Sequence, residues 1–166
     1  LKEQGIETID AITLLPDKKA LDGKIYGVIR IPVGTLRYGP SYASEQATQL
    51  LMGTPVRILK KEGWYLVQTP EDYVSWVSSS SVEPMTRQQF NEYLSHKKLI
   101  FLSDKGWIYE KPDASSPRVA SVVVGALLLD KGTKGKYAHV ELPDGRKGYV
   151  LKSDVTDFDQ WRKETR

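Results

Sequence analysis

The stretch that decides the fold is GWYLVQTPEDYVSWV, residues 63–77. Two runs of aromatic and β-branched residues, which favour strands, flank Pro70-Glu71-Asp72. Proline fixes φ, and an aspartate side chain can hydrogen-bond to its own backbone, so these three residues favour a turn. The pattern therefore predicts a β-hairpin.

A second copy of this hairpin occurs later in the chain, as GKYAHVELPDGRKGYV at residues 135–150. A shift of 72 residues aligns glycines and prolines between the copies: Gly34 with Gly106, Pro40 with Pro112, Gly53 with Gly125, and Gly63 with Gly135. After one inserted residue, a shift of 73 aligns Val67 with Val140 and Trp76 with Tyr149. Glycine and proline are selected by backbone geometry, so these matches predict the same turns twice. We expect a duplicated β domain, with the inserted residue forming a β-bulge at Ala138-His139.

Each copy contains five or six short strands with tight turns, a pattern typical of a small barrel, and residues 36–41 are expected to form a loop. A unit of about sixty residues is near the lower limit for an independent core, so the two units should lean on each other. We place the first unit at 24–84 and the second at 99–156, joined by a helical linker at 85–98. Residues 157–166 are expected to form a C-terminal helix or linker.

Residues 1–23 are expected to form an N-terminal extension packed on the first barrel. Two alternatives remain open for its local structure. Ile6, Ile9, Ile12 and Leu15 are spaced three apart and could face the core from a short helix, whereas residues 11–14 could equally form an edge strand.

The linker carries the signals of a helix start. Thr86 followed by Gln89 is a capping box, and Phe90, Tyr93 and Leu94 then share one helical face, which we expect to dock between the two barrels. Near the C-terminus, Thr156 is expected to cap the final helix, with Trp161 packed on the second barrel or on a further domain.

Composition excludes several classes of function. The net charge is only +3 and the basic residues are dispersed, which disfavours a nucleic-acid partner. No apolar run approaches the length of a membrane span. The chain has no cysteine, and its two histidines, His96 and His139, lack the carboxylate or serine partners of a metal or catalytic site. We expect no catalytic group, no metal and no cofactor.

The remaining functional signal is aromatic. Trp64, Tyr73 and Trp76 alternate with the expected core residues Tyr65, Val67, Val74 and Val77, which places at least some of them on the outer side of the barrel. Together with Tyr38 or Tyr42, their rings could line a cleft for a peptide or a sugar. The alternative is that each ring seals its own small barrel.

A family resemblance rests on five short motifs, which occur in the order Leu36-Arg37-Tyr38-Gly39-Pro40, Met52-Gly53-Thr54-Pro55-Val56, Gly63-Trp64-Tyr65, Ser75-Trp76-Val77 and Met85-Thr86-Arg87. The first four resemble the bacterial SH3-like (SH3b) domain of cell-wall enzymes. With the duplication and the helical linker, the whole resembles the N-terminal half of NlpC-type γ-D-glutamyl-L-diamino acid endopeptidases. The resemblance implies a mostly β fold with two small SH3-like barrels in tandem joined by a short helix.

The resemblance also implies a function. In that family a C-terminal papain-like domain supplies a Cys nucleophile, so this chain would be a non-catalytic accessory module of the cell envelope, bacterial and either periplasmic or secreted. It would bind or position the murein stem peptide beside that catalytic partner domain. The catalytic domain would either belong to the same polypeptide or have been removed from it.

By position, Tyr38 and Tyr73 match the residues that bound the peptide pocket. Gly39 stands where relatives often carry an acidic residue. Tyr109 replaces Arg37 and Arg146 replaces Tyr73 in the second unit, which is therefore expected to be mainly structural. The alternative is a structural or protein-interaction module without a ligand site of its own.

Overall fold

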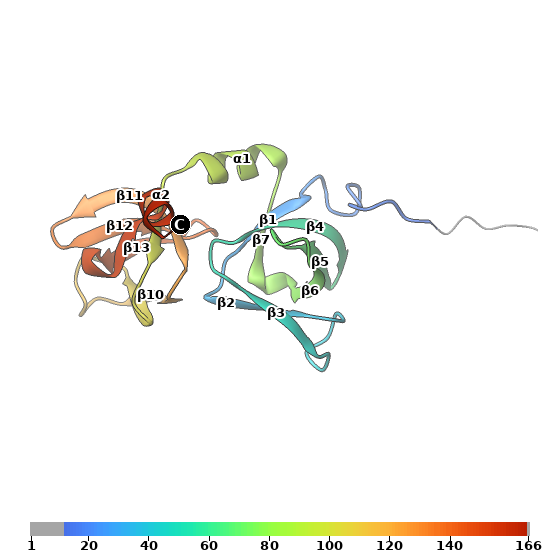
Figure 1. Ribbon diagram of the computed structural model, residues 1–166, viewed down its shortest axis with the longest axis horizontal. Coiled ribbons are helices and arrows are strands. Elements are labelled where there is room, and N and C mark those ends of the chain that lie inside the picture. The colour runs from blue at the N-terminus through green and yellow to red at the C-terminus, as the bar shows by residue number, and fades with distance from the viewer. Residues whose placement is uncertain (1–11, 166) are drawn as a thin grey trace, which may run out of the picture.

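The computed structural model describes residues 12–165, which form two antiparallel β units side by side, bridged by one helix (Figure 1). The first sheet has the strand order β3-β2-β6-β5-β4-β1-β7. Its strands are β1 (Tyr26–Ile29), β2 (Val33–Arg37), β3 (Gln46–Leu51), β4 (Pro55–Glu62), β5 (Trp64–Gln68), β6 (Val74–Ser78) and β7 (Val82–Met85). A 3₁₀ turn, η2 (Ser79–Ser81), joins the last two.

The second sheet has the same topology, in the order β10-β9-β13-β12-β11-β8-β14, so that each strand of the first sheet has its equivalent seven strands later in the chain. Its strands are β8 (Lys98–Phe101), β9 (Lys105–Tyr109), β10 (Arg118–Val123), β11 (Leu127–Lys134), β12 (Tyr137–Glu141), β13 (Lys147–Leu151) and β14 (Val155–Asp157), with η3 (Lys152–Asp154) before β14. The predicted mostly β fold of two SH3-like units in tandem is confirmed.

The repeated glycines serve the same purpose in both copies. A Cβ atom on Gly34 would lie 3.3 Å from Cγ2 of Ile29, and one on Gly106 would lie 2.7 Å from Cζ of Phe101. Ile29 and Phe101 are themselves 72 residues apart, and both side chains are fully buried in the core of their own barrel. In each copy a glycine thus makes room for the large core side chain on the preceding strand.

The predicted β-bulge at Ala138-His139 is wrong. Strand β12 pairs with β13 without interruption, and the register shift lies on the neighbouring strand, between Asp130 and Thr133 of β11. The first barrel has the same shift between Ile58 and Lys60 of β4. Both barrels are therefore bulged alike, and the inserted residue is accommodated in the hairpin turn, where Gly135 and Lys136 replace the single Gly63.

Two strands of the first barrel were missed by the sequence analysis. Leu36 and Arg37, expected in a loop, end β2, where they pair with Val77 and Trp76 of β6. Residues 83–85, which we had divided between the first unit and the linker, belong to β7 and pair with β1. Leu36 and Arg37 pair with residues about 40 positions away on β6, and β7 pairs with residues more than 50 positions away on β1, which local patterns do not reveal.

The helix α1 (Arg87–Ser95) joins the two barrels and begins with the predicted capping box. The Gln89 backbone N–H donates to Thr86 Oγ1 at 3.3 Å, and the Thr86 N–H donates to Gln89 Oε1 at 2.9 Å. Tyr93 is buried in a small cluster with Val28 and Met85 of the first unit and Leu129 of the second. The docking of the helix between the barrels is confirmed for Phe90 and Tyr93, but Leu94 is 48% exposed.

The barrels also touch each other directly. Met52, in the β3–β4 turn of the first barrel, is fully buried and belongs to the core of the second. Its carbonyl accepts a hydrogen bond of 2.9 Å from the Leu127 N–H. The expectation that the two units lean on each other is confirmed, because a residue of one completes the core of the other.

At the N-terminal side, residues 12–25 contain neither the short helix nor the edge strand that we considered, and the part of that prediction at residues 1–11 lies outside the described residues. Ile12 and Leu14 are exposed. Leu21 is buried in the first core, and the Asp17 N–H donates to the Leu59 carbonyl at 2.9 Å. This segment therefore packs on the first barrel through a turn.

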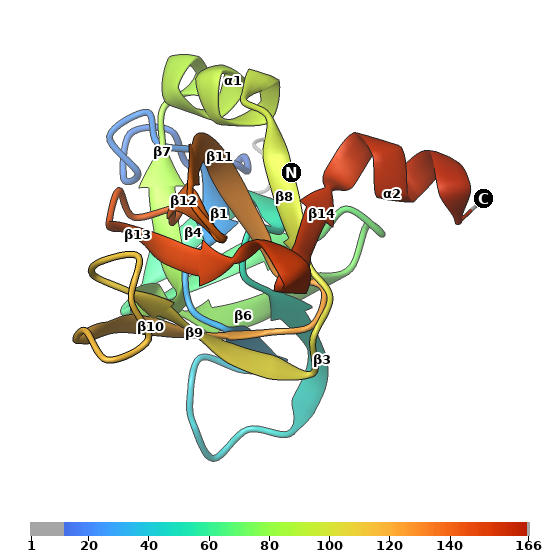
Figure 2. The ribbon, with the colours of Figure 1, turned by 90° about the vertical axis from the view of Figure 1, so that its left-hand side faces the viewer.

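The C-terminal helix α2 (Phe158–Glu164) leaves the second barrel directly after β14 (Figure 2). Its N-cap is Asp157, which accepts a 2.9 Å hydrogen bond from the Gln160 N–H, so the prediction of Thr156 was wrong by one residue. Trp161 is half-buried and stacks on Phe158, and the helix contacts β8 and β14. None of the helices in the part of the chain described here is long and apolar enough to cross a membrane.

Candidate functional site

The histidines have structural surroundings. His96 ends α1, where its Nδ1 lies 2.6 Å from the Glu92 carbonyl oxygen, and His139 stacks on Tyr149 with ring centroids 4.8 Å apart. Within residues 12–165, no three histidine, aspartate or glutamate side chains are grouped so that they could hold a metal ion.

The outer face of β5 and β6 carries the two predicted tryptophans. Tyr65, Val67 and Val77 are buried, while Trp64 and Trp76 are partly exposed on the opposite face. Val74 was predicted in the core, but it is 51% exposed. Side chains alternate along a strand, so Val74 shares the outer face with Trp76, and Ser75 takes the buried position.

Trp64 is covered by a neighbouring loop. Tyr42, in the loop between β2 and β3, packs edge-on against Trp64 with centroids 4.7 Å apart, and its hydroxyl donates to Ser78 Oγ at 3.3 Å. The loop is fixed at its base by Arg37, whose Nη1 donates to the Ser44 carbonyl at 2.7 Å. Trp64 thus anchors the loop that carries Tyr38 and Tyr42.

Trp76 lies on the same outer face, between its cross-strand partners Arg37 on β2 and Leu66 on β5. Trp64 pairs with Ser78 and is therefore diagonal to Trp76, within reach of a large side chain. Trp76, Trp64 and Tyr42 therefore lie on the same side of the first barrel, where Tyr42 contacts Trp64.

Tyr38 and Tyr73 are both largely exposed, at 72% and 64%, as is Tyr42 at 73%. Tyr38 follows the end of β2, and Tyr73 precedes the start of β6, which runs antiparallel to β2. Both therefore lie toward one end of the β2–β6 pair. Across residues 12–165, neither ring stacks on another aromatic ring or lies under a cation.

The turn that carries Tyr73 is well ordered by hydrogen bonds. The Thr69 N–H donates to the Tyr73 carbonyl at 2.8 Å, and the Tyr73 N–H donates to Thr69 Oγ1 at 3.3 Å. Thr69 is buried, and Gln68 Nε2 donates to Asp72 Oδ1 at 3.1 Å. These bonds hold the exposed Tyr73 ring on a defined turn.

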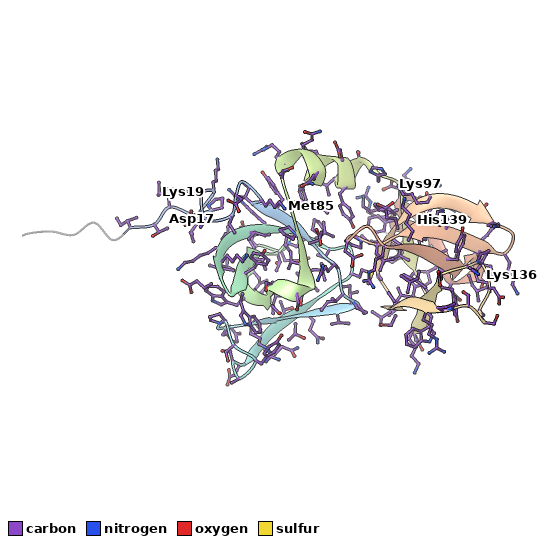
Figure 3. All side chains as sticks on the ribbon, turned by 180° about the vertical axis from the view of Figure 1, so that it is seen from behind. Asp17, Lys19, Met85, Lys97, Lys136 and His139 are labelled. Atoms are coloured by element: carbon purple, nitrogen blue, oxygen red, sulfur yellow. The ribbon has the colours of Figure 1, made fainter. Side chains whose placement is uncertain are left out.

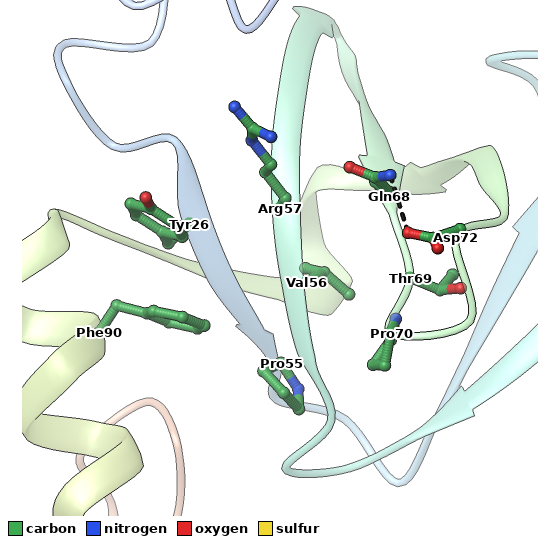
Figure 4. A pocket seen from close by; sticks show the side chains of 9 residues that line it. All are labelled: Tyr26, Pro55, Val56, Arg57, Gln68, Thr69, Pro70, Asp72 and Phe90. Carbon is green, nitrogen blue, oxygen red and sulfur yellow. Dashed lines mark hydrogen bonds between the residues drawn. The ribbon is translucent and has the colours of Figure 1, made fainter.

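A groove that the sequence did not reveal lies on the other side of this turn (Figure 4). It has a volume of about 280 Å³ and is bounded by Tyr26 and Phe90 on one side and by Pro70 and Asp72 on the other. A second hollow of about 460 Å³ lies between the barrels, beside α1 and α2. Phe90 was recognised as part of an apolar helix face, but its pairing with Tyr26 depends on how the helix packs.

The C-terminal end of α1 is capped by the side chain of a lysine. Lys98 Nζ donates to the carbonyls of Tyr93, Leu94 and His96 at 2.7, 3.1 and 2.9 Å, which satisfies the free acceptors of the last helical turn. Burial lowers the pKa of Lys98 and raises that of the Tyr93 phenol. Tyr93 is thus buried where the helix meets the barrels, whereas Tyr38 and Tyr73 face solvent.

Comparison with known proteins agrees with this architecture. Residues 36–82 match the family model described as the bacterial dipeptidyl-peptidase SH3 domain. No curated protein sequence matches the chain.

Two solved structures share the fold. An NlpC/P60 family protein from Bacillus cereus ATCC 10987 is 18% identical, with a TM-score of 0.65 over 79% of this chain and 55% of that one. An NlpC/P60 endopeptidase from Photobacterium damselae subsp. piscicida is 14% identical, with a TM-score of 0.58 over 87% of this chain and 35% of that one. The chain therefore spans about half of the first protein and about a third of the second. The resemblance to the SH3-like part of NlpC-type proteins is confirmed for the fold.

Proposed function

We propose that this chain is the non-catalytic SH3-like part of an NlpC-type cysteine peptidase of the bacterial cell envelope, and that it positions a murein stem peptide beside a papain-like catalytic domain. Support comes from the SH3 match at residues 36–82 and from the fold shared with two NlpC/P60 proteins. The observation that carries the proposal is the pair of exposed phenols, Tyr38 and Tyr73, on two ordered loops toward one end of the first barrel.

Phenols suit this task because an exposed tyrosine offers an apolar ring and a hydrogen-bonding hydroxyl on a side chain with little rotamer entropy to lose. In this proposal Tyr38 and Tyr73 contact the peptide, while Trp76 extends the contact surface along β6. Trp64 contributes through its exposed edge and by holding the Tyr42 loop in place.

The second candidate function is a structural or protein-interaction module. The covering of Trp64 by Tyr42 favours it, since a ring packed in this way stabilises the barrel whether or not a ligand binds. The two functions differ in what the exposed tyrosines do, so a substitution of Tyr73 separates them.

The test is a substitution in the complete peptidase. Tyr73→Ala is expected to lower kcat/KM for a murein peptide roughly tenfold, which corresponds to about 1.4 kcal/mol of transition-state stabilisation. The matched control is Trp107→Ala, which removes a half-exposed ring from the second barrel. Equal kcat/KM in wild type and Tyr73→Ala would favour the structural module.

A further inference from the structure

The groove beside the Tyr73 turn has apolar walls. On one side, Phe90 of α1 stacks on Tyr26 of β1, with centroids 4.7 Å apart and planes inclined by 16° (Figure 4). On the other side lie Pro55 and Pro70, at the start of β4 and in the turn after β5. Proline rings and stacked aromatic rings offer apolar surface at little entropic cost on binding.

This groove continues toward the second barrel. The larger hollow shares Pro55 and Pro70 with it and adds Leu94 of α1, Leu127 of β11 and Phe158 of α2. Phe90 and Leu94 are four residues apart and lie on the same side of α1. The two hollows thus adjoin at Pro55 and Pro70 beside α1, and we refer to them together as the channel; the larger one is also lined by the polar side chains of His96, Lys98, Asp159 and Arg162.

The end of the channel nearest Tyr73 is cationic. Tyr26, Arg57 and Gln68 are direct cross-strand partners on β1, β4 and β5, so Arg57 lies between the aromatic pair and the turn. Its guanidinium is exposed and pairs with no carboxylate among residues 12–165. One carboxylate, that of Asp72, also lines this end and accepts a hydrogen bond from Gln68, and a second cation, Arg87, lies 5.5 Å from the Tyr26 ring centroid.

We infer that this channel binds the acidic part of an extended peptide, with a carboxylate on Arg57 and apolar side chains against Tyr26–Phe90 and Pro55–Pro70. An arginine can hold a carboxylate through two parallel N–H···O bonds, which fixes the orientation of the peptide as well as its charge. The positive charges of Arg57 and Arg87, which the Asp72 carboxylate offsets only in part, and the apolar walls together favour a peptide that combines carboxylates with small apolar side chains.

The inference rests on the proposed function and extends it. Residues 69–73 form the wall between the channel and the exposed Tyr73, so a stem peptide at Tyr73 can continue past Pro70 toward Arg57. The expected occupant is therefore the carboxylate-bearing remainder of the same stem peptide.

The experiment is a titration of the isotope-labelled chain, followed by NMR, with the synthetic stem tetrapeptide L-Ala-γ-D-Glu-L-Lys-D-Ala. The same peptide with its carboxylates amidated tests the role of charge. Arg57→Gln is expected to weaken binding of the acidic peptide about fivefold and to leave binding of the amidated peptide unchanged. The matched control is Lys105→Gln, the same loss of charge on an exposed strand of the second barrel, which should bind as wild type.

The residues whose NMR signals shift on titration distinguish this inference from the function on which it rests. Shifts at Tyr26, Arg57 and Phe90 that diminish with the amidated peptide support it. Shifts confined to Tyr38 and Tyr73 overturn it while leaving the proposed function intact. Shifts confined to the channel support it and contradict the assignment of the tyrosines, and a complete absence of shifts overturns both.

Discussion

Gly53 and Leu127 are packed so closely that a Cβ atom on Gly53 would lie 2.5 Å from Cβ and 2.6 Å from the carbonyl oxygen of Leu127. Gly125, its counterpart in the second copy, lies against the end of the Leu51 side chain, with a Cβ position 2.7 Å from Leu51 Cδ1. The turns before β4 and β11 therefore face each other. The same duplicated glycine that shapes each turn also lets the two barrels approach.

Gly53→Ala is expected to loosen the contact between the barrels. The residue has φ of +90°, where an L side chain is strained by about 1–2 kcal/mol, and the clash with Leu127 adds an overpacking cost of about 1–3 kcal/mol. Urea denaturation should show a lower free energy of unfolding by about the sum of the two.

Gly63→Ala is the matched control for this substitution. Gly63 has φ of +70°, but nothing lies within 4 Å of its Cβ position, so it carries the strain without the clash. If Gly53→Ala destabilised the protein no more than Gly63→Ala, the close docking of the barrels would be refuted.

Tyr93→Phe is expected to destabilise the junction through a single hydrogen bond. The buried hydroxyl donates to the Gly53 carbonyl at 3.0 Å, and its removal leaves that buried acceptor unpaired at a cost of about 1–3 kcal/mol. Chemical denaturation measures the loss. Tyr73→Phe, which removes an exposed hydroxyl, should unfold like wild type.

The Tyr93 phenol also predicts that the free energy of unfolding depends on pH in the alkaline range. Burial raises the pKa of Tyr93 above its ordinary value of about 10, so the folded state retains a proton that the unfolded state has lost. The contribution of the protonated Tyr93 phenol to the free energy of unfolding is complete below a pH of about 10 and decreases as the pH rises further. The difference in unfolding free energy between wild type and Tyr93→Phe should shrink over that range, and a constant difference would contradict the burial of the phenol.

Asp157 is expected to control the start of α2. A hydrogen bond from the Gln160 N–H lowers the pKa of this carboxyl. Lys97, which is labelled in Figure 3, contributes by pairing with both Asp157 and Asp130 at 3.3 Å. Stability from a lowered carboxyl pKa is present above pH of about 4 and is lost as the pH falls through the folded-state value.

Asp157→Ala removes both the cap and the ion pair, so α2 should fray, at a cost of about 1 kcal/mol for the cap. Amide exchange of residues 160–164 measures the fraying, with Asp104→Ala, an exposed acid on the second barrel, as control. Unchanged exchange after Asp157→Ala would show that the packing of Phe158 and Trp161 alone holds the helix.

Much of the fold was predictable because it is encoded locally and twice. The glycine matches predicted two equivalent units, and Thr86 with Gln89 predicted the start of α1. Val74 was misassigned because it sits at the turn end of β6, where a hydrophobic residue can face solvent.

The contacts between residues far apart in sequence were not predictable in the same way. Met52 completes the core of the other barrel, Arg57 lies beside the Tyr26–Phe90 pair, and Tyr42 covers Trp64. Each contact joins residues far apart in sequence, and none leaves a periodic signal. Sequence reasoning named the aromatic residues of the candidate site but did not reveal the channel.

The central claim is that the chain supplies a surface for a murein peptide and no reactive group. It is tested most directly by mixing the labelled chain with purified muropeptides, while NMR follows Tyr38 and Tyr73 and chromatography follows the peptides. We predict saturable shifts at both tyrosines with a dissociation constant of about 1 mM or weaker, together with intact peptides. Cleavage of the muropeptides by this chain alone, or unchanged tyrosine signals at saturating peptide, would contradict the account.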